Sequence, residues 1–541
     1  MKRLGGGAPP LSGRPQPVIA FAERDWVVVG DLRNLTGDPG LTEALDVAFR
    51  ISLEQSRHVN VLSDLKVRDT LSRMQREPGT PLDRETGAEI AVREGARALI
   101  LPSVAEVGGR VRISAEVVDP TTLTTVYAES HDGVGVESTL RSMDRVTGAL
   151  RARLGEALQG IESDSQPLPQ VSTGSMDALR AYAEGLGYLG QTRFKQAEAA
   201  FSRALEIDPE FALAYIGRAR THAGADDIDA AHAQMMEARA RSERLGGRDR
   251  LYVDAWAASF GPLEDALQAW RLLASLYPDD FAAHYNIGWL AWSQGRVDQA
   301  ARQSALRAAD PKNPFKDAAH SMAGVLSMLL GDVEGALEQF QSMTPGAPPL
   351  LASRHAMALY AAGRGNAARE ILEAAAPAPE AALEPYWHLA GITMDWADGN
   401  SVQARRHLEQ VAARAAAAGG HEHRRMMLAS HMLDRFEGVA DAGRTRLLCE
   451  EMSSALRSAL RNGSSGHLVG AALCAYLLAS FDPDVARDLL TLIEELARPG
   501  FPIQQSSQAV AAAELARVSG NPDEAVALLQ PLAEKPALLL V

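Results

Sequence analysis

The chain has 541 residues, which is too long for one hydrophobic core and predicts roughly two to four core units. With 46% hydrophobic and 23% charged residues, its composition is that of globular domains and argues against a disordered chain. Its formal net charge of −15 argues against nucleic acid as a partner, because nucleic-acid-binding domains normally carry a basic surface.

The two ends of the chain carry little regular pattern. Residues 1–24 are rich in Gly and Pro and predict a flexible leader without the apolar core of a signal peptide. No apolar run reaches the roughly 18 residues of a membrane span, so we expect no membrane segment and a cytoplasmic chain. Residues 537–541 stop inside an apolar helical pattern. The sequence therefore also fits a fragment of a longer protein, with the periplasmic portion of a membrane-anchored protein as the alternative location.

Residues 25–160 alternate between the periodicities of strands and helices and predict a small α/β (α+β) domain. Strands are expected over 26–30, 59–62, 98–104, 111–118 and 124–128, and helices over 41–55, 63–74, 84–95 and 137–158. Gly108 and Gly109 lie between two of the strands and predict a hairpin, so the sheet is expected to be partly antiparallel. The segment 34–40 is dense in turn-forming residues and is predicted as a turn.

Three polar residues follow the first predicted strand: Asp31, Arg33 and Asn34. Ligands often bind just beyond the carboxyl ends of strands in open α/β sheets, which makes these residues a candidate site. The alternative is a turn stabilised by side-chain hydrogen bonds of the Asx type, and we favour the turn.

Residues 161–175 are polar, contain two prolines and predict a linker between domains. From 176 to 541 the apolar spacing predicts successive helical hairpins that form an all-α solenoid. In 178–211 small, aromatic and turn-forming residues fit a repeating frame of about 34 residues: Gly185, Tyr188, Ala197, Phe201, Ala204 and Pro209. Gly185 and Ala197 are expected where the two helices cross closely, and Phe201 is expected to fill the space beside them.

Weaker copies of this frame continue along the chain and indicate roughly eight to ten helical pairs. The clearest markers are Ala231 and Ala238; Ala266, Trp270 and Pro278; Gly288, Ala300 and Pro311; and Gly324, Ala336 and Phe340. Residues 421–500 are predicted to be helical but do not follow the frame.

On these residues the helical part resembles tetratricopeptide-repeat proteins. The α/β part resembles the TolB-like (FlgO-like, CsgG-related) domain, on residues 28–38 followed by a helix and the strand at 59–62. Residues 49–56 and 73–82 are similar to the C-terminal region of peptide modification system cyclases, which are bacterial signalling proteins. That likeness implies that the cyclase domain and the membrane helix of those proteins are absent from this chain.

The sequence offers little chemistry for catalysis. It has no phosphate-binding loop, no nucleophile elbow and no zinc-protease motif, so we expect no catalytic residues, no metal and no cofactor. His421 and His423 alternate along a helix and would point about 200° apart, too far to share one ion. Cys449 and Cys474 lie in apolar stretches and are predicted to be small buried core residues.

Four isolated histidines are expected to be packing or surface residues rather than catalytic bases. They are His58, His284, His320 and His355.

The predicted binding site is the concave groove that first helices line in such solenoids. The repeat frame assigns six residues to it: Tyr182, Leu186, Arg220, Tyr285, Trp289 and Trp292. Three aromatic residues on one helix form a plausible peptide-binding platform. The alternative is that they pack against the neighbouring helix.

We therefore expect a non-catalytic scaffold or sensor that binds a protein or peptide. The alternative is the regulatory part of a signalling protein, such as a nucleotide cyclase of a peptide modification system, whose catalytic domain lies outside this chain.

Overall fold

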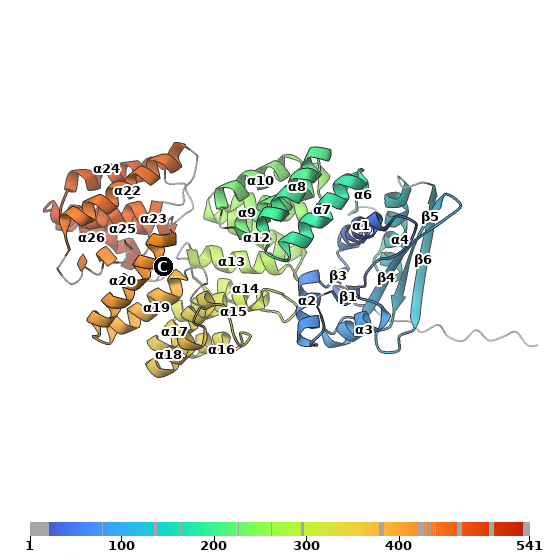
Figure 1. Cartoon of the computed structure of the whole chain (residues 1–541), viewed down its shortest axis with the longest axis horizontal. Helices are drawn as coiled ribbons and strands as arrows, with labels where there is room; N and C mark the ends of the chain where they lie inside the picture. The colour runs from blue at the N-terminus through green and yellow to red at the C-terminus, as the bar shows by residue number, and fades with distance from the viewer. Residues whose placement is uncertain are drawn as a thin grey trace, which may run out of the picture. The chain divides into compact units, whose positions relative to one another are not determined.

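The computed structural model (Figure 1) describes residues 21–533 except 78, 135–137, 159–160, 162–164, 226, 261, 294–296, 378–383, 419–426, 428–429, 433, 436–437, 439, 462–467 and 497–501. The chain divides into two compact units, Met1–Arg250 and Leu251–Val541. In the described ranges, no helix combines the length and the apolar character that crossing a membrane requires.

The first unit contains a 6-stranded mixed sheet with the order β3-β1-β4-β5-β6, in which β2 also pairs with β4. The strands are β1 Asp25–Val29, β2 Arg33–Leu35, β3 Val59–Val61, β4 Ala98–Val107, β5 Arg110–Val118 and β6 Thr125–Val134. β1 runs parallel to β3 and β4, whereas β4, β5 and β6 are antiparallel neighbours. Gly108 and Gly109 have positive φ angles and make the predicted turn between β4 and β5.

Helices cover both faces of this sheet. They are α1 Thr42–Glu54, α2 Asp64–Arg73, α3 Arg84–Arg93 and α4 Thr139–Arg153. Val28 lies in one core cluster with residues of α2 and α3, whereas α4 contacts β5, β6 and α1. Since side chains alternate along a strand, the buried Val27 and Val29 face the opposite side from Val28. The Ser63 hydroxyl accepts a hydrogen bond from the backbone N–H of Lys66 and so caps α2.

The prediction of a turn over 34–40 was wrong at its start. Arg33–Leu35 forms β2, which pairs in parallel with β4 from Ser103 to Ala105. The turn begins after this strand, where the Asn34 Oδ1 accepts a hydrogen bond from the Thr36 backbone N–H at 2.9 Å. Long-range pairing with β4 thus overrides the local preference for a turn in these residues.

The segment 165–175 precedes the first repeat helix and makes hydrogen bonds both to the sheet domain and to the repeats. It contains the short helix α6 Leu168–Val171, and Leu168 and Val171 are buried. The Leu168 N–H donates to the Asp144 carboxylate of α4 at 2.7 Å. The Thr173 hydroxyl donates to the Asp208 carboxylate, which follows the second repeat helix, at 2.6 Å. The segment therefore joins the sheet domain to the first helical pair within one compact unit.

Repeat helices complete the first unit. They are α7 Met176–Leu189, α8 Phe194–Ile207, α9 Ala212–Gly224 and α10 Ile228–Ala240. A Cβ atom on Gly185 would lie 2.6 Å from the Phe201 ring, and one on Gly217 would lie equally close to that ring. Glycine is therefore needed for the close crossing of α7, α8 and α9, as the sequence frame predicted for Gly185.

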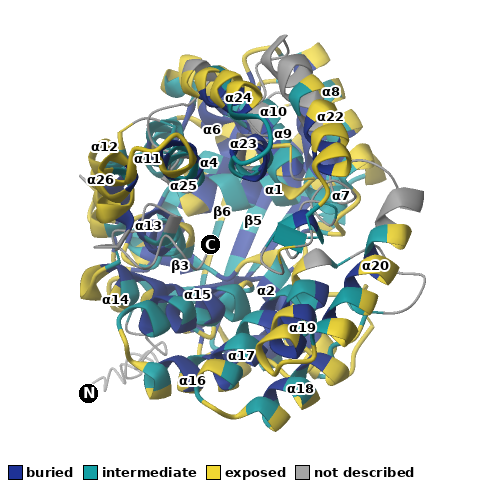
Figure 2. Cartoon of the chain, turned by 90° about the vertical axis from the view of Figure 1, so that its left-hand side faces the viewer, coloured by how far each residue is buried: buried dark blue, intermediate teal, exposed yellow. Residues whose placement is uncertain are grey.

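Helices make up the described part of the second unit. After α11 Gly247–Ala258 they are α12 Leu263–Leu276, α13 Phe281–Ser293, α14 Gln299–Ala308, α15 Lys316–Leu329, α16 Val333–Gln341, α17 Pro349–Ala361, α18 Gly365–Ala374, α19 Pro385–Ala397, α20 Ser401–Ala418, α22 Ala442–Arg461, α23 Leu468–Leu478, α24 Pro483–Leu496, α25 Pro502–Val518 and α26 Pro522–Ala533. Buried residues lie where neighbouring helices meet, and exposed residues lie on their outer faces (Figure 2). Trp270 of α12 is fully buried, with Tyr252 of α11 edge-on to its ring.

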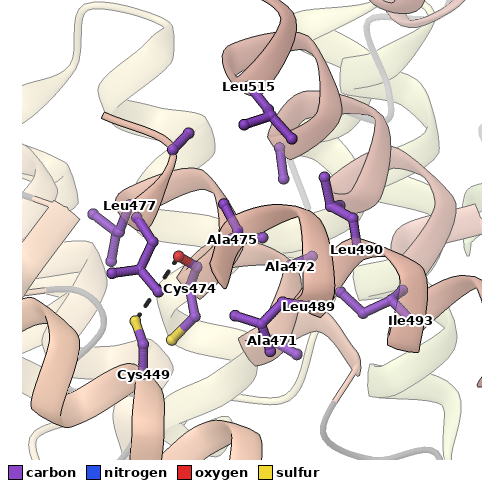
Figure 3. Packing of buried hydrophobic residues seen from close by; sticks show 14 of the residues in the cluster. Cys449, Ala471, Ala472, Cys474, Ala475, Leu477, Leu489, Leu490, Ile493 and Leu515 are labelled. Atoms are coloured by element: carbon purple, nitrogen blue, oxygen red, sulfur yellow. Dashed lines mark hydrogen bonds between the residues drawn. The ribbon is translucent and has the colours of Figure 1, made fainter. Parts of the chain in front are cut away.

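The final helices form a separate core cluster, on α22 to α25 (Figure 3). Cys449 and Cys474 belong to this cluster and are buried free thiols, which confirms their predicted role as small core residues. The Cys449 thiol lies 3.8 Å from the backbone carbonyl oxygen of Cys474, which is its hydrogen-bond acceptor.

Candidate protein-interaction surface

The first helices of successive pairs form a continuous layer in the second unit. α13 contacts α15, α15 contacts α17, and α17 contacts α19, whereas α14, α16 and α18 pack mainly against their own partners and the next first helix. Residues three or four positions apart lie on the same side of one helix. One side of α13, of α15 and of α17 can therefore together form a single surface. We call this surface the first-helix face.

The three predicted aromatic residues of α13 contribute to packing between neighbouring helices. Tyr285, Trp289 and Trp292 are all partly buried and contact a core cluster that includes Ala305 and Met322. Trp289 also contacts the cluster around Trp270. Each side chain thus supports the joint between repeats while part of it stays accessible. A role in binding a partner stays a prediction.

An arginine from α17 reaches these aromatic rings. The Arg354 guanidinium carbon lies 5.4 Å from the centroid of the Trp292 ring, within the range of a cation–π contact. Its Nη1 donates a long hydrogen bond of 3.4 Å to the hydroxyl of Ser321, a buried residue of α15. One side chain therefore joins α13, α15 and α17.

The electrostatic surroundings of Arg354 are unusual for a cation. Burial lowers the pKa of Arg354, and the phenols of Tyr285 and Tyr386 oppose this effect. Burial raises the pKa of Tyr285, and the Arg354 cation opposes that change. Within the described part of the chain, Arg354 forms no ion pair, and no carboxylate contributes to its pKa. Arg354, Trp292, Tyr285 and Ser321 form a group that we call the Arg354 cluster. It therefore holds a positive charge that no described carboxylate neutralises.

The other three predicted residues belong to the first unit. Tyr182 of α7 is buried, and its ring centroid lies 4.8 Å from that of Phe211 and 5.6 Å from that of Phe201. Leu186 is half-buried, and Arg220 of α9 is exposed. Tyr182 therefore offers little surface to a partner, whereas Leu186 and Arg220 remain accessible.

The sequence frame missed Arg354 because the repeats after residue 345 are degenerate. A signal was nevertheless present in the helix that carries it. The sequence of α17, PLLASRHAMALYA, contains one arginine and no acidic residue. A helix with a basic residue and no carboxylate three or four positions away cannot neutralise that charge locally.

The four isolated histidines make local contacts, as predicted. His58 contacts the Leu154 carbonyl oxygen at 3.1 Å through Nε2, and His284 contacts the Ser304 hydroxyl at 3.0 Å through Nδ1. His320 contacts the Gln339 side chain at 3.0 Å, and His355 stacks on Phe340.

A further histidine pair was not predicted. His388 Nδ1 of α19 lies 3.1 Å from His407 Nε2 of α20. Burial, followed by the nearby His407, lowers the pKa of His388 to about 4. The described residues contain no group of three side chains that could hold a metal ion, and His421 and His423 lie outside them.

The comparisons with known proteins bear on the helical part. A family model described as tetratricopeptide repeat matches residues 182–244 and 257–315. Together with the element order, this match defines an N-terminal α/β region with a mixed sheet followed by tetratricopeptide-type helical repeats, which confirms the predicted fold class. Tetratricopeptide repeats are generally scaffolds for protein interactions. No curated protein matches the chain.

Several solved structures share local similarity with the chain. A tetratricopeptide repeat protein from Parabacteroides merdae is 12% identical, with a TM-score of 0.34, and the match covers 48% of this chain and 99% of that one. PilF from Pseudomonas aeruginosa is 18% identical, with a TM-score of 0.26 and coverages of 46% and 96%. The LpoB C-terminal domain from Salmonella enterica is 13% identical, with a TM-score of 0.20 and coverages of 22% and 87%. The TolB-like and cyclase resemblances stay predictions.

Proposed function

We propose that the chain is a non-catalytic scaffold whose first-helix face binds a protein or an extended peptide. The observation that carries this proposal is the group of partly exposed aromatic residues on α13, Tyr285, Trp289 and Trp292, in a chain with only 5% aromatic residues. Large aromatic side chains dominate binding energy at protein interfaces. The absence of a recognisable catalytic motif from the sequence favours a scaffold over an enzyme.

The first unit has first helices of its own, α7 and α9, which contact each other. Leu186 and Arg220 are its accessible residues, and Tyr182 supports them from the core. We propose a secondary role for them, because the neighbouring aromatic residue Tyr182 is buried.

The test is capture of a partner from lysate of the source cell, followed by titration of the purified partner. Trp292→Leu and Tyr285→Leu remove the aromatic surface and retain an apolar side chain for the core. Leu272→Ala is the matched control, because Leu272 lies on the second helix α12 with 48% of its surface exposed. Weaker capture by the two aromatic variants but not by the control supports the proposal. Equal capture by all folded variants would place the binding site elsewhere.

A second candidate function is the regulatory part of a bacterial signalling protein such as a nucleotide cyclase. Its support is the resemblance carried by residues 49–56 and 73–82. In this structure Arg50 forms an ion pair with Asp64 at 2.9 Å, so this part of the resembling sequence also has a structural role. The test is the genomic sequence upstream of codon 1. An in-frame cyclase-coding segment supports this function, and an in-frame stop codon without one contradicts it.

The location of the chain also stays a prediction. A cytoplasmic location follows from the sequence as written, and a periplasmic location follows from the cyclase resemblance. Fractionation of source cells, with an antibody against the chain, distinguishes the two.

A further inference from the structure

We infer that the partner of the first-helix face is an extended peptide segment with an aspartate or glutamate side chain that pairs with Arg354. This inference rests on the proposed function and adds the chemical character of the partner. Its basis is a juxtaposition on three neighbouring first helices: Arg354 of α17, which has no carboxylate partner among the described residues, the Trp292 and Tyr285 rings of α13, and the Ser321 hydroxyl of α15.

Other arginines of the second unit form ion pairs with carboxylates of the same chain. Arg302 pairs with Asp332 at 2.9 Å, Arg364 with Glu334 at 2.8 Å, and Arg369 with Asp395 at 2.8 Å. Arg354 is partly buried, yet its hydrogen-bond acceptor is the neutral Ser321 hydroxyl. A neutral hydroxyl cannot replace a carboxylate as the partner of a guanidinium.

Removing a cation from water without an opposite charge is unfavourable, so a buried guanidinium normally has a carboxylate partner. The Trp292 ring offsets part of this cost, because a cation above an aromatic face is attracted by the negative charge of that face. The planar guanidinium still has N–H groups that can bind both oxygens of a carboxylate. A carboxylate from a partner would therefore meet a preformed donor, with Trp292 and Tyr285 available to the apolar residues beside it.

A peptide fits this cluster better than a nucleic acid does. Nucleic-acid binding draws its affinity from several cations that contact successive phosphates. The Arg354 cluster presents a single cation flanked by the Tyr285 phenol, and the formal net charge of the chain is −15. One charged contact beside apolar surface is the pattern expected for a single acidic side chain within an otherwise apolar segment.

The experiment is selection of phage-displayed random twelve-residue peptides on the full chain. Display as an N-terminal fusion leaves no free C-terminal carboxylate on the peptide, so any acidic preference reports side chains. The same selection is made on Arg354→Met, which keeps the apolar length of the side chain. The control is Arg307→Gln, which changes an exposed arginine on the second helix α14. Circular dichroism checks that each variant is folded.

We expect peptides selected by the wild type and by Arg307→Gln to share an acidic residue beside apolar residues. Arg354→Met should bind those peptides at least about tenfold more weakly, because hydrogen bonds to charged groups contribute about 1.5–3 kcal/mol. Replacing the acidic residue with its amide should weaken wild-type binding similarly and leave binding to Arg354→Met unchanged.

Two other outcomes would separate failure of the inference from failure of the proposed function. Peptides without an acidic preference, or with equal affinity for Arg354→Met, would overturn the inference while leaving peptide binding intact. If neither chain selects any peptide, the proposed function itself fails for peptides. Binding of a single-stranded oligonucleotide that depends on Arg354 would overturn the peptide inference in favour of nucleic acid.

Discussion

Two arginines, Arg151 in the first compact unit and Arg354 in the second, differ in how the fold accommodates their charge. In the first unit Arg151 is almost fully buried and donates two hydrogen bonds to the Glu156 carboxylate, at 2.7 and 2.8 Å. Burial alone would raise the pKa of Glu156, but the hydrogen bonds from Arg151 and Ser56 lower it. In the second unit Arg354 has aromatic and hydroxyl neighbours, and none of the described carboxylates pairs with it.

A cation with an internal partner and a cation without one have different consequences for stability. An internally paired cation such as Arg151 needs nothing from outside and stabilises its own unit. An arginine without an internal counterion reduces stability unless a partner supplies the opposite charge, and such groups are candidates for binding sites. The following predictions test each side of this comparison.

The largest loss of stability is expected from removing the carboxylate that pairs with Arg151 in the first unit. Glu156→Gln removes the negative charge and leaves Arg151 buried without a counterion, so the free energy of unfolding should fall by about 3–5 kcal/mol. Urea unfolding measures this change. The control is Arg153→Gln, which removes the exposed ion pair with Glu129 and should change stability by less than about 1 kcal/mol. If both variants lost similar free energy of unfolding, the buried Arg151–Glu156 pair would matter no more for stability than the exposed pair.

A comparable effect is expected from protonation of the histidine pair in the second unit. The folded chain lowers the pKa of His388 to about 4 from an ordinary value of 6.5, so the unfolded chain takes up this proton first as the pH falls. The stability that His388 contributes is therefore complete above pH 6.5 and is lost progressively toward pH 4, by up to about 3 kcal/mol.

Urea unfolding between pH 7 and pH 4 measures this loss for the wild type and for His388→Gln. The variant should show a shallower dependence on pH, because its position 388 no longer titrates. Identical slopes for the two chains would contradict a role for His388.

A smaller loss of stability is expected from crowding the close helix crossings. Such crossings occur in both units and involve no charged group. A Cβ atom on Gly324 would lie 2.8 Å from the Phe340 ring, much as one on Gly185 would meet Phe201 in the first unit. Gly185→Ala and Gly324→Ala should each lower the free energy of unfolding by about 1–3 kcal/mol. The control is Gly187→Ala, which meets no atom within 4 Å and should raise helix stability by up to about 1 kcal/mol. Thermal unfolding of the three variants tests whether their effects have opposite signs.

The smallest change in the free energy of unfolding is expected from Arg354→Met. Replacing an unpaired, partly buried cation with an apolar side chain of similar length should leave the free energy of unfolding unchanged or raise it by up to about 1 kcal/mol. Thermal unfolding of the full chain measures the change. If the free energy of unfolding fell by more than about 1 kcal/mol, the main role of Arg354 would be to stabilise the packing of α13, α15 and α17 through its contact with Trp292.

Local sequence determined most of the elements of this protein. A continuous apolar run specified the strand at 26–29, and alternating apolar residues specified the strand at 111–118. Ser63 specified the start of α2, because a capping signal depends on neighbouring residues alone. The close helix crossing at Gly185 was also predictable, since a repeating frame places a small residue opposite Phe201. The degenerate repeats after residue 345 still formed helical pairs, although their frame gave no guide to surface residues.

Only the tertiary structure decided the features that depend on residues far apart in the sequence. Arg33–Leu35 became a strand because β4 supplied hydrogen-bonding partners some seventy residues away along the chain. Tyr182 was assigned to a binding surface by the repeat frame, but contacts with Phe201 and Phe211 place it in a core. The Arg354 cluster draws on α13, α15 and α17. Its chemistry arises from spatial neighbours that supply rings and a hydroxyl but no carboxylate, and no local pattern encodes that combination.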